Sequence, residues 1–225
     1  RAGRGGADAE LVAQRRAEAK ASSAYRTFFV IFLLYPLLSR TAFHMTPTSC
    51  QALGDAEQWH MDDMAIDHAV LVHPEPYGDD HRLVLDCLER APDRLHGPSL
   101  FYPNDPGAAD KLVHLVESQP RIIATRFHAH RGKEMYLGTF GDEGVQRLWR
   151  AAVHLGLIVE LHIGPDYAAQ VRDVLDAMPE TTVLIDHLAE PHMGDAVEYA
   201  DVLDLARYDG VYMKLSGIGH FAHDP

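Results

Sequence analysis

Two histidines stand at the ends of short β-branched apolar runs, each just before a turn that contains glycine or proline. His162 ends the run Leu157-Ile-Val-Glu-Leu-His162, and His187 ends the run Thr181-Thr-Val-Leu-Ile-Asp-His187. A neutral imidazole binds zinc and similar ions well, and it also transfers protons near neutral pH. Because helical patterns follow both runs, the two histidines suit a metal or proton-transfer site at the ends of neighbouring parallel strands. A strand-end histidine bound by its own loops is the alternative for each.

Two cationic residues lie inside apolar strand patterns. Burial of an unpaired charge is costly, so Arg126 and Lys214 each need an anion. A substrate carboxylate held by the guanidinium fork of Arg126 is one answer, and an internal Asp or Glu is the other. Lys214 has the same two alternatives. We therefore predict a substrate-binding role for both residues, with an internal ion pair as the competing interpretation.

The acidic residues beside the two histidines are expected to face in different directions. Side chains alternate along a strand, so Glu160 shares its side with His162. Glu160 is therefore a candidate catalytic residue, either as a hydrogen-bond partner of the histidine or as a general base. By the same alternation, Asp186 is expected to point away from His187, toward the helices.

A second pair of histidines and a tyrosine are candidates for contact with the substrate. His128-Ala-His130 is a His-x-His sequence, whose two rings point the same way along a strand. A metal pair is one interpretation, but a substrate contact by His128 is the one we favour. Tyr136 lies in the segment 133–138, which is long enough to form a partial lid, and is predicted to bind substrate.

Apolar strand patterns and helical patterns alternate regularly from about residue 51 onward. The expected strands are 67–73, 95–102, 121–128, 157–163, 183–188 and 210–216. The expected helices are 51–65, 79–90, 106–118, 142–155, 166–178 and 196–208. Such alternation indicates an α/β fold with a parallel sheet. The nucleotide-binding motifs G-x-G-x-x-G and G-x-x-x-x-G-K-[ST] are absent from the sequence, and the polar strand ends favour a closed barrel.

Composition excludes several classes of partner. The net charge of −13 argues against nucleic acid, because phosphate binding needs clustered Lys and Arg. The two cysteines form no C-x-x-C and suggest no disulfide framework, so a reducing, cytoplasmic location fits. Cys87 falls in a helical pattern, where packing is expected rather than reactivity.

The first residues form a segment of different character. Residues 1–26 are basic and are expected to be disordered or a frayed helix, and residues 27–225 are expected to form the barrel. The apolar run Phe28–Tyr35 imitates the core of a signal peptide, but a buried first strand is the interpretation we favour. The run is much shorter than the roughly 20 residues that span a bilayer, so we expect no membrane association.

The ordered motifs resemble those of a known family. The segments are Met61–Val72, Thr125-Arg-Phe-His128, Leu161-His162-Ile-Gly-Pro, Ile185-Asp-His187-Leu-Ala-Glu-Pro and Met213-Lys-Leu-Ser-Gly217. Together they are similar to the amidohydrolase-related (amidohydrolase-2) metal-dependent hydrolases over roughly residues 45–223. The resemblance implies a (β/α)8 TIM barrel, here incomplete, with about seven βα units. It also implies that His162 and His187 are the metal-binding histidines of the fifth and sixth strands, with zinc as the expected ion.

The same resemblance implies hydrolysis of a lactone, or of another C–O or C–N bond, in a small carboxylated molecule by metal-activated water. The sequence departs from the family pattern in two places: Phe28–Tyr35 contains no His-x-His, and the chain ends before an eighth strand with its aspartate. A metal-independent lactonase or decarboxylase of the same fold is therefore an alternative. A truncated, inactive chain that needs a partner, as in a homo-oligomer, is another.

Overall fold

The computed structural model describes residues 28–31, 67–73, 77–90, 93–129 and 136–217. The chain divides into two compact units. Unit 1 comprises residues 1–99 and 116–123, and unit 2 comprises residues 100–115 and 124–225. The basic lead at 1–26, the expected helix 51–65, His130 and residues 133–135 of the expected lid lie outside the described residues.

Unit 1 is built from parallel strands and a helix. Strands β1 (Phe28–Ile31), β2 (His68–Leu71) and β3 (Leu95–Leu100, in unit 1 as far as Ser99) follow one another, with β1 pairing with β2 and β2 with β3. β1 confirms a strand at the start of the apolar run that begins at Phe28. Helix α3 (Arg82–Arg90) buries Leu83, Val84, Cys87 and Leu88, a spacing of three and four residues that puts them on one face. Cys87 is fully buried, as expected for a packed residue.

Two histidines lie side by side near the starts of strands β2 and β3. The ring centroids of His68 and His96 are 6.0 Å apart. Burial lowers the pKa of His96 below its usual value, and the charges of His68 and Arg121 lower it further. The folded chain therefore binds a proton at His96 less readily than the unfolded chain does.

This shift predicts that acid weakens unit 1 through His96. Between about pH 7.5 and about pH 5.5 the unfolded chain takes up the proton first, because its histidine pKa stays near 6.5. The free energy of unfolding should consequently fall as the pH drops through this range. His96→Gln should reduce that fall, measured by urea denaturation at both pH values. An equal fall in the wild type and in the His96→Gln variant would contradict the prediction.

Unit 2 carries the remaining strands in chain order. β4 (Ile122–His128, in unit 2 from Ala124), β5 (Ile158–His162), β6 (Val183–Ile185) and β7 (Val211–Met213) pair in parallel, each with the next. The register sets Arg126 opposite Glu160 and His128 opposite His162. Laterally paired residues share a side of a parallel sheet, so this register brings four polar side chains together.

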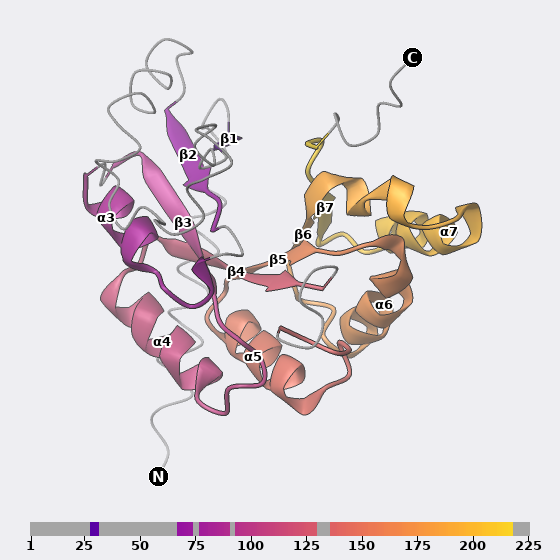
Figure 1. Ribbon diagram of the computed structural model, residues 1–225, viewed down its shortest axis with the longest axis horizontal. Helices are drawn as coiled ribbons and strands as arrows, with labels where there is room; N and C mark the ends of the chain where they lie inside the picture. Colours follow the sequence, from indigo (N-terminus) through magenta and orange to yellow (C-terminus); the bar gives the residue numbers. More distant parts are fainter. Residues whose placement is uncertain (1–27, 32–66, 74–76, 91–92, 130–135, 218–225) are drawn as a thin grey trace, which may run out of the picture. The chain divides into compact units, whose positions relative to one another are not determined.

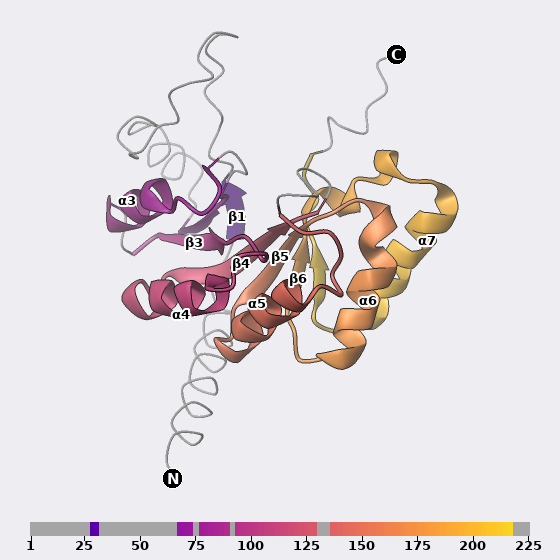
Figure 2. The same ribbon diagram turned by 60° about the horizontal axis from the view of Figure 1, so that its bottom comes forward.

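Helices alternate with the strands of unit 2. α4 (Ala108–Ser118, in unit 2 as far as Leu115), α5 (Glu143–His154), α6 (Ala168–Ala177) and α7 (Ala196–Asp204) alternate with the strands, and Figures 1 and 2 show α5 and α6 along one face of β5 and β6. α5 buries Val145, Leu148, Trp149 and Ala152. Gly156, with φ at 69°, follows its last turn in the left-handed conformation that glycine tolerates. Short 3-10 turns at Pro165–Tyr167, Pro191–Met193 and Leu205–Arg207 flank α6 and α7.

The end of β6 differs from the expected strand 183–188. The strand stops at Ile185, and the 3-10 turn η5 (Asp186–Ala189) follows directly. The residues from His187 to Glu190 have φ values of 51°, 55°, 60° and 49°. This left-handed conformation is rare for residues other than glycine, and strand propensity gave no sign of it. The prediction of a strand as far as residue 188 is therefore wrong.

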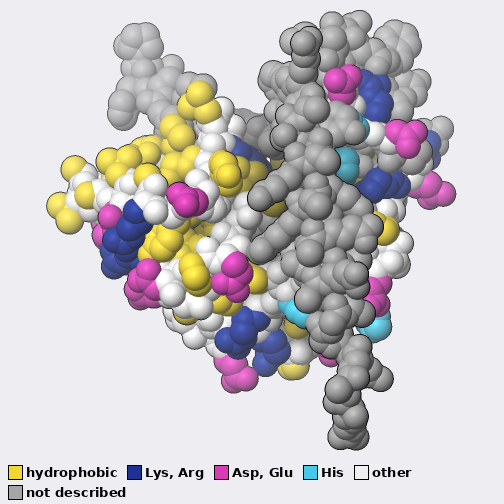
Figure 3. All heavy atoms as spheres, turned by 180° about the vertical axis from the view of Figure 1, so that it is seen from behind, with side chains coloured by type: hydrophobic (Ala, Val, Ile, Leu, Met, Phe, Trp, Pro, Cys, Tyr) yellow, Lys and Arg dark blue, Asp and Glu magenta, His cyan; other side chains and the backbone are white. Residues whose placement is uncertain are grey.

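Exposed apolar side chains gather near the end of the described chain. They are Met193 before α7, Val197 and Leu203 on α7, Tyr212 on β7 and Leu215 after it. Figure 3 shows hydrophobic side chains collected over this part of the molecule, at the left of the view. Larger exposed apolar patches often mark surfaces that bind another protein. The homo-oligomer remains a prediction. Among the described residues, no helix has the length and apolar character needed to cross a membrane.

Candidate active site

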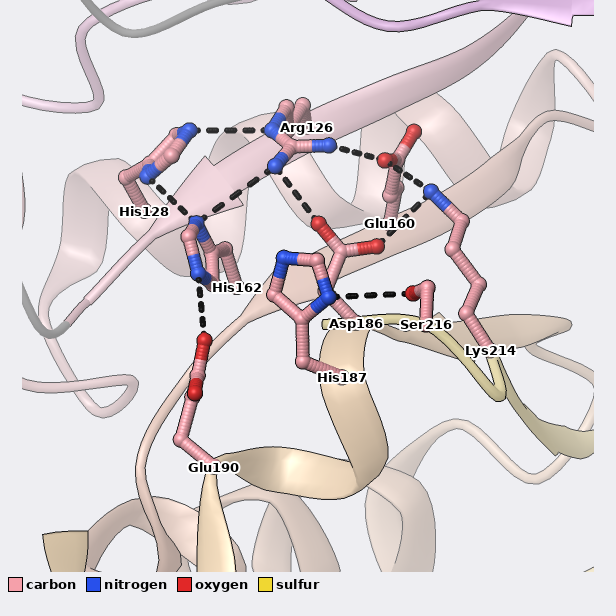
Figure 4. A network of polar contacts seen from close by, with 9 residues as sticks. All are labelled: Arg126, His128, Glu160, His162, Asp186, His187, Glu190, Lys214 and Ser216. Atoms are coloured by element: carbon pink, nitrogen blue, oxygen red, sulfur yellow. Dashed lines mark hydrogen bonds and ion pairs between the residues drawn. The ribbon is translucent and has the colours of Figure 1, made fainter. Parts of the chain in front are cut away.

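The two strand-end histidines meet in unit 2. His162 is the last residue of β5, and His187 lies in the turn that follows β6. Their ring centroids are 5.1 Å apart, and both residues are buried. Figure 4 shows the two rings side by side. The predicted convergence of these rings is confirmed, whereas their catalytic and metal-binding roles remain predictions.

A third residue, Glu190, joins the two histidines. One potential ligand atom from each of His162, His187 and Glu190 lies within 4.8 Å of the others. Glu190 is buried, and its Oε1 lies 3.2 Å from His162 Nε2. Two imidazoles and a carboxylate form a donor set that catalytic zinc uses, with room for water at a further position. The residues present therefore fit a divalent cation.

The sequence did not reveal Glu190 because the backbone conformation that positions its side chain could not be predicted. It stands three residues after His187, inside the motif that ends in Glu-Pro. On a strand or in an irregular loop, that spacing does not predict that the two side chains point in the same direction. The left-handed turn η5 and the residue after it bring both side chains to one place.

The segment after β7 holds the ring of His187. Ser216 Oγ lies 3.0 Å from His187 Nδ1, and the backbone N–H of Leu188 donates to the carbonyl of Lys214. Gly217 has φ at 67°, and a Cβ there would lie 2.6 Å from His187 Nδ1. Glycine at this position therefore allows both the backbone conformation and the close approach of the ring.

Four buried charged residues form a network behind the histidines. Arg126 pairs with Glu160 through Nη1 and with Asp186 through Nη2, the second at 2.5 Å. Lys214 Nζ lies 2.5 Å from Glu160 Oε1 and 2.7 Å from Asp186 Oδ1. Each of the four side chains is at most 7% exposed. The two positive and two negative charges balance, as burial of charges requires.

The network shifts the ionisation of its members toward the charged forms. Burial raises the pKa of Asp186, but the charges of Arg126 and Lys214 outweigh that effect and hold the pKa below its usual range. Burial likewise lowers the pKa of Arg126, while Glu160 and Asp186 raise it above its ordinary value. Mutual neutralisation therefore keeps both partners ionised inside the protein.

Asp186 does not face the helices, so that expectation is wrong. The pairing of Glu160 with Leu184 places Leu184 on the side of β6 that faces the network. Asp186, two residues later, keeps to that side. The alternation instead breaks at His187, whose positive φ turns its side chain to the same region. Both residues therefore contribute to the site.

The other predicted residues also lie in this region of unit 2. For Arg126 and Lys214, internal carboxylates supply the anions, which is the second of the two alternatives. Glu160 binds both cations. His128 contacts Arg126 and His162, and the ring of Tyr136 is buried with its centroid 5.9 Å from that of His128. Contact of these residues with a substrate remains a prediction.

Comparison with known proteins places the chain in a family. The sequence profile of the family described as Amidohydrolase matches residues 46–225. The chain belongs to the amidohydrolase family. This confirms the resemblance found in the motifs around His162, His187 and Lys214.

Individual amidohydrolase relatives support the same placement. The chain is 26% identical over 166 residues to 4-sulfomuconolactone hydrolase from Rhizobium radiobacter, which covers 72% of this chain and 53% of the relative. It therefore spans about half the length of that curated protein. The crystal structure of a probable 2-pyrone-4,6-dicarboxylic acid hydrolase from Acinetobacter baumannii, with citric acid bound, is 25% identical with a TM-score of 0.63, covering 83% of this chain and 67% of that chain.

A more distant amidohydrolase shares the fold. The structure of an amidohydrolase from Burkholderia multivorans with bound zinc has a TM-score of 0.59 at 14% identity, covering 72% of this chain and 58% of that chain. The fold class predicted from the sequence, an incomplete (β/α)8 barrel, is confirmed by the similarity to the Acinetobacter structure. In barrels of this kind, active sites lie at the C-terminal ends of the strands, where His162 and His187 are found.

Proposed function

We propose that this chain carries the centre of a hydrolase that opens a lactone, or another C–O or C–N bond, in a small carboxylated molecule. We further propose that His162, His187 and Glu190 hold a divalent cation, with zinc as the expected ion. The observation that carries the proposal is the convergence of their ligand atoms within 4.8 Å in a buried position. The names of a 26% identical lactone hydrolase and a 25% identical pyrone-dicarboxylate hydrolase support the substrate class.

The residues of the chain would prepare this site for hydrolysis. A bound cation would lower the pKa of a coordinated water to about 7 and would polarise the carbonyl group of the substrate. The Ser216 hydroxyl orients the ring of His187, and Glu190 orients that of His162. Second contacts of this kind fix the direction in which a histidine ring faces its ligand.

The two glutamates would have different tasks. Glu160 accepts hydrogen bonds from Arg126 and Lys214, so its contacts support the role of a network partner rather than of a general base. Glu190 contacts His162 directly. It would be a ligand in the cation-dependent version, and in the cation-free version it is the carboxylate that we assign to proton transfer at the reacting group. His128 and Tyr136 would bind the substrate beside His162, while direct contact by Arg126 or Lys214 stays a prediction.

A cation-free version of the same hydrolysis is the second candidate. His162 Nε2 and Glu190 Oε1, 3.2 Å apart, form an imidazole–carboxylate pair. Such a pair can polarise a carbonyl through the imidazole N–H and take a proton from water through the carboxylate. The two versions share their residues and differ in their need for a cation.

Metal analysis and turnover of a panel of lactones test the proposal with two variants. His162→Ala and His187→Ala should each lose bound zinc and should lower turnover by about 10²-fold or more. His154→Ala, at the exposed end of α5, is the matched control and should change neither property. Turnover that survives removal of the cation but falls in both variants would favour the cation-free version. Unchanged turnover in both variants would refute the cation-dependent and the cation-free version alike.

A further inference from the structure

A continuous row of contacts joins Arg126 to Glu190 through two histidine rings (Figure 4). Arg126 Nε lies 2.9 Å from His128 Nε2. His128 Nδ1 lies 3.2 Å from His162 Nδ1, and His162 Nε2 lies 3.2 Å from Glu190 Oε1. Arg126 Nη2 also approaches His162 Nδ1, at 3.5 Å.

The chemistry of the two end groups sets the direction of this row. A guanidinium can only donate hydrogen bonds, and an ionised carboxylate can only accept them. His128 Nε2 must therefore accept from Arg126, which leaves the single proton of a neutral ring on Nδ1. That proton is donated to His162 Nδ1, so the proton of His162 lies on Nε2 and is donated to Glu190. The second approach of Arg126 to His162 Nδ1 requires the same arrangement.

We infer that Arg126 is a positioning residue that fixes the tautomers of two histidines, with the proton on Nδ1 in His128 and on Nε2 in His162. The ion pairs to Glu160 and Asp186 hold two of the guanidinium nitrogens, so the remaining Nε–H points at His128. Arg126 is nearly fully buried, and its side chain cannot turn without breaking these pairs. The balanced charge network thus acts on the histidines through the geometry of one guanidinium.

The consequence concerns what His162 offers to a ligand. Its Nε2 carries a hydrogen in the unliganded protein, so it can donate to a carbonyl oxygen. A cation that binds through Nε2 needs the lone pair at that position, and it must therefore displace this proton. The inference concerns the protein without ligand, so it holds or fails independently of the proposed hydrolase.

His187 provides an internal comparison. Its Nδ1 faces the hydroxyl of Ser216, which can donate or accept a hydrogen bond. The contact therefore fixes the direction of the ring but not its tautomer. A substitution at Ser216 should change His187 and leave His128 and His162 as they were.

The test is ¹⁵N NMR of the histidine rings in the full chain without metal, at about pH 9, where rings with ordinary pKa values are neutral. Resonances are assigned by their loss in His128→Phe and His162→Phe. In the wild type, His128 should show a protonated Nδ1 and His162 a protonated Nε2. The opposite tautomer, or an even mixture, in either ring would overturn the inference, and this measurement needs no stable variant at Arg126.

A variant then tests the cause. Arg126→Lys keeps the positive charge but removes the Nε–H that faces His128. His128 should shift toward the Nε2-protonated form in this variant, while His187 stays unchanged. Ser216→Ala should move the resonances of His187 alone. An unchanged tautomer of His128 in a folded Arg126→Lys protein would show that a group other than Arg126 fixes the positions of the ring protons.

Discussion

Glu190→Gln is expected to lower kcat/KM for a lactone substrate by about 10²- to 10⁴-fold, the usual contribution of a positioned acid–base group. The amide keeps the size of the side chain but loses the negative charge, so it is a weaker ligand and cannot take a proton. Steady-state kinetics with a lactone panel measure the effect, and zinc analysis shows whether cation binding falls in parallel.

The control for this prediction is another glutamate of unit 2. Glu180 is exposed, and Glu180→Gln should leave turnover within the error of the wild type. If Glu190→Gln retained wild-type kcat/KM, the carboxylate beside His162 would have no part in the reaction. The proposed centre would then be reduced to the two histidines.

Lys214→Met should destabilise the protein by about 3–5 kcal/mol, which is the usual result of removing one partner from a buried ion pair. The substitution leaves Glu160 and Asp186 with Arg126 as the one remaining cation of the network. Urea denaturation should show a lower midpoint with a similar slope. A loss of less than about 1 kcal/mol would mean that water reaches these carboxylates.

Two comparisons separate charge balance from the loss of packing. The double variant Lys214→Met with Glu160→Gln removes one charge of each sign and should recover part of the lost stability. Arg147 forms an exposed pair with Glu143 at 3.3 Å on α5. Arg147→Met should therefore change the free energy of unfolding by about 0.5 kcal/mol or less.

Periodicity was enough to predict most elements of unit 2. The helix expected at 142–155 is α5, which is one residue shorter at each end, and the strand expected at 121–128 is β4, which starts one residue later. These segments are regular, so apolar spacing of three to four residues or a continuous apolar run describes them well. The strand ends that carry His128 and His162 followed from the same patterns.

The sequence indicated that ion pairs must form but not which residues form them. A charge within an apolar strand requires a counter-charge, so the need of Arg126 and Lys214 for anions was clear from the sequence. Which carboxylates pair with them depends on the register of the four parallel strands β4 to β7 and on the turn after β6. Local propensity contains no information about either, because register is set by long-range packing.

The same limit explains the errors around Asp186 and Glu190. Alternation was extended through residue 188, although the strand ends at Ile185 and the left-handed residues begin at His187. With alternation assumed, Asp186 faces the helices and Glu190 has no defined direction. A histidine, a leucine, an alanine and a glutamate give no turn signal, since left-handed positions are normally marked by glycine or asparagine.

The left-handed stretch has a consequence for how this sequence can change. Each L-residue in that conformation carries roughly 1–2 kcal/mol of steric cost, and glycine would relieve it. Glycine at positions 187 or 190, however, would delete an imidazole or a carboxylate from the centre. In the described residues this is the one run of non-glycine residues with positive φ. Selection for thermal stability and selection for chemistry therefore favour different residues at these positions.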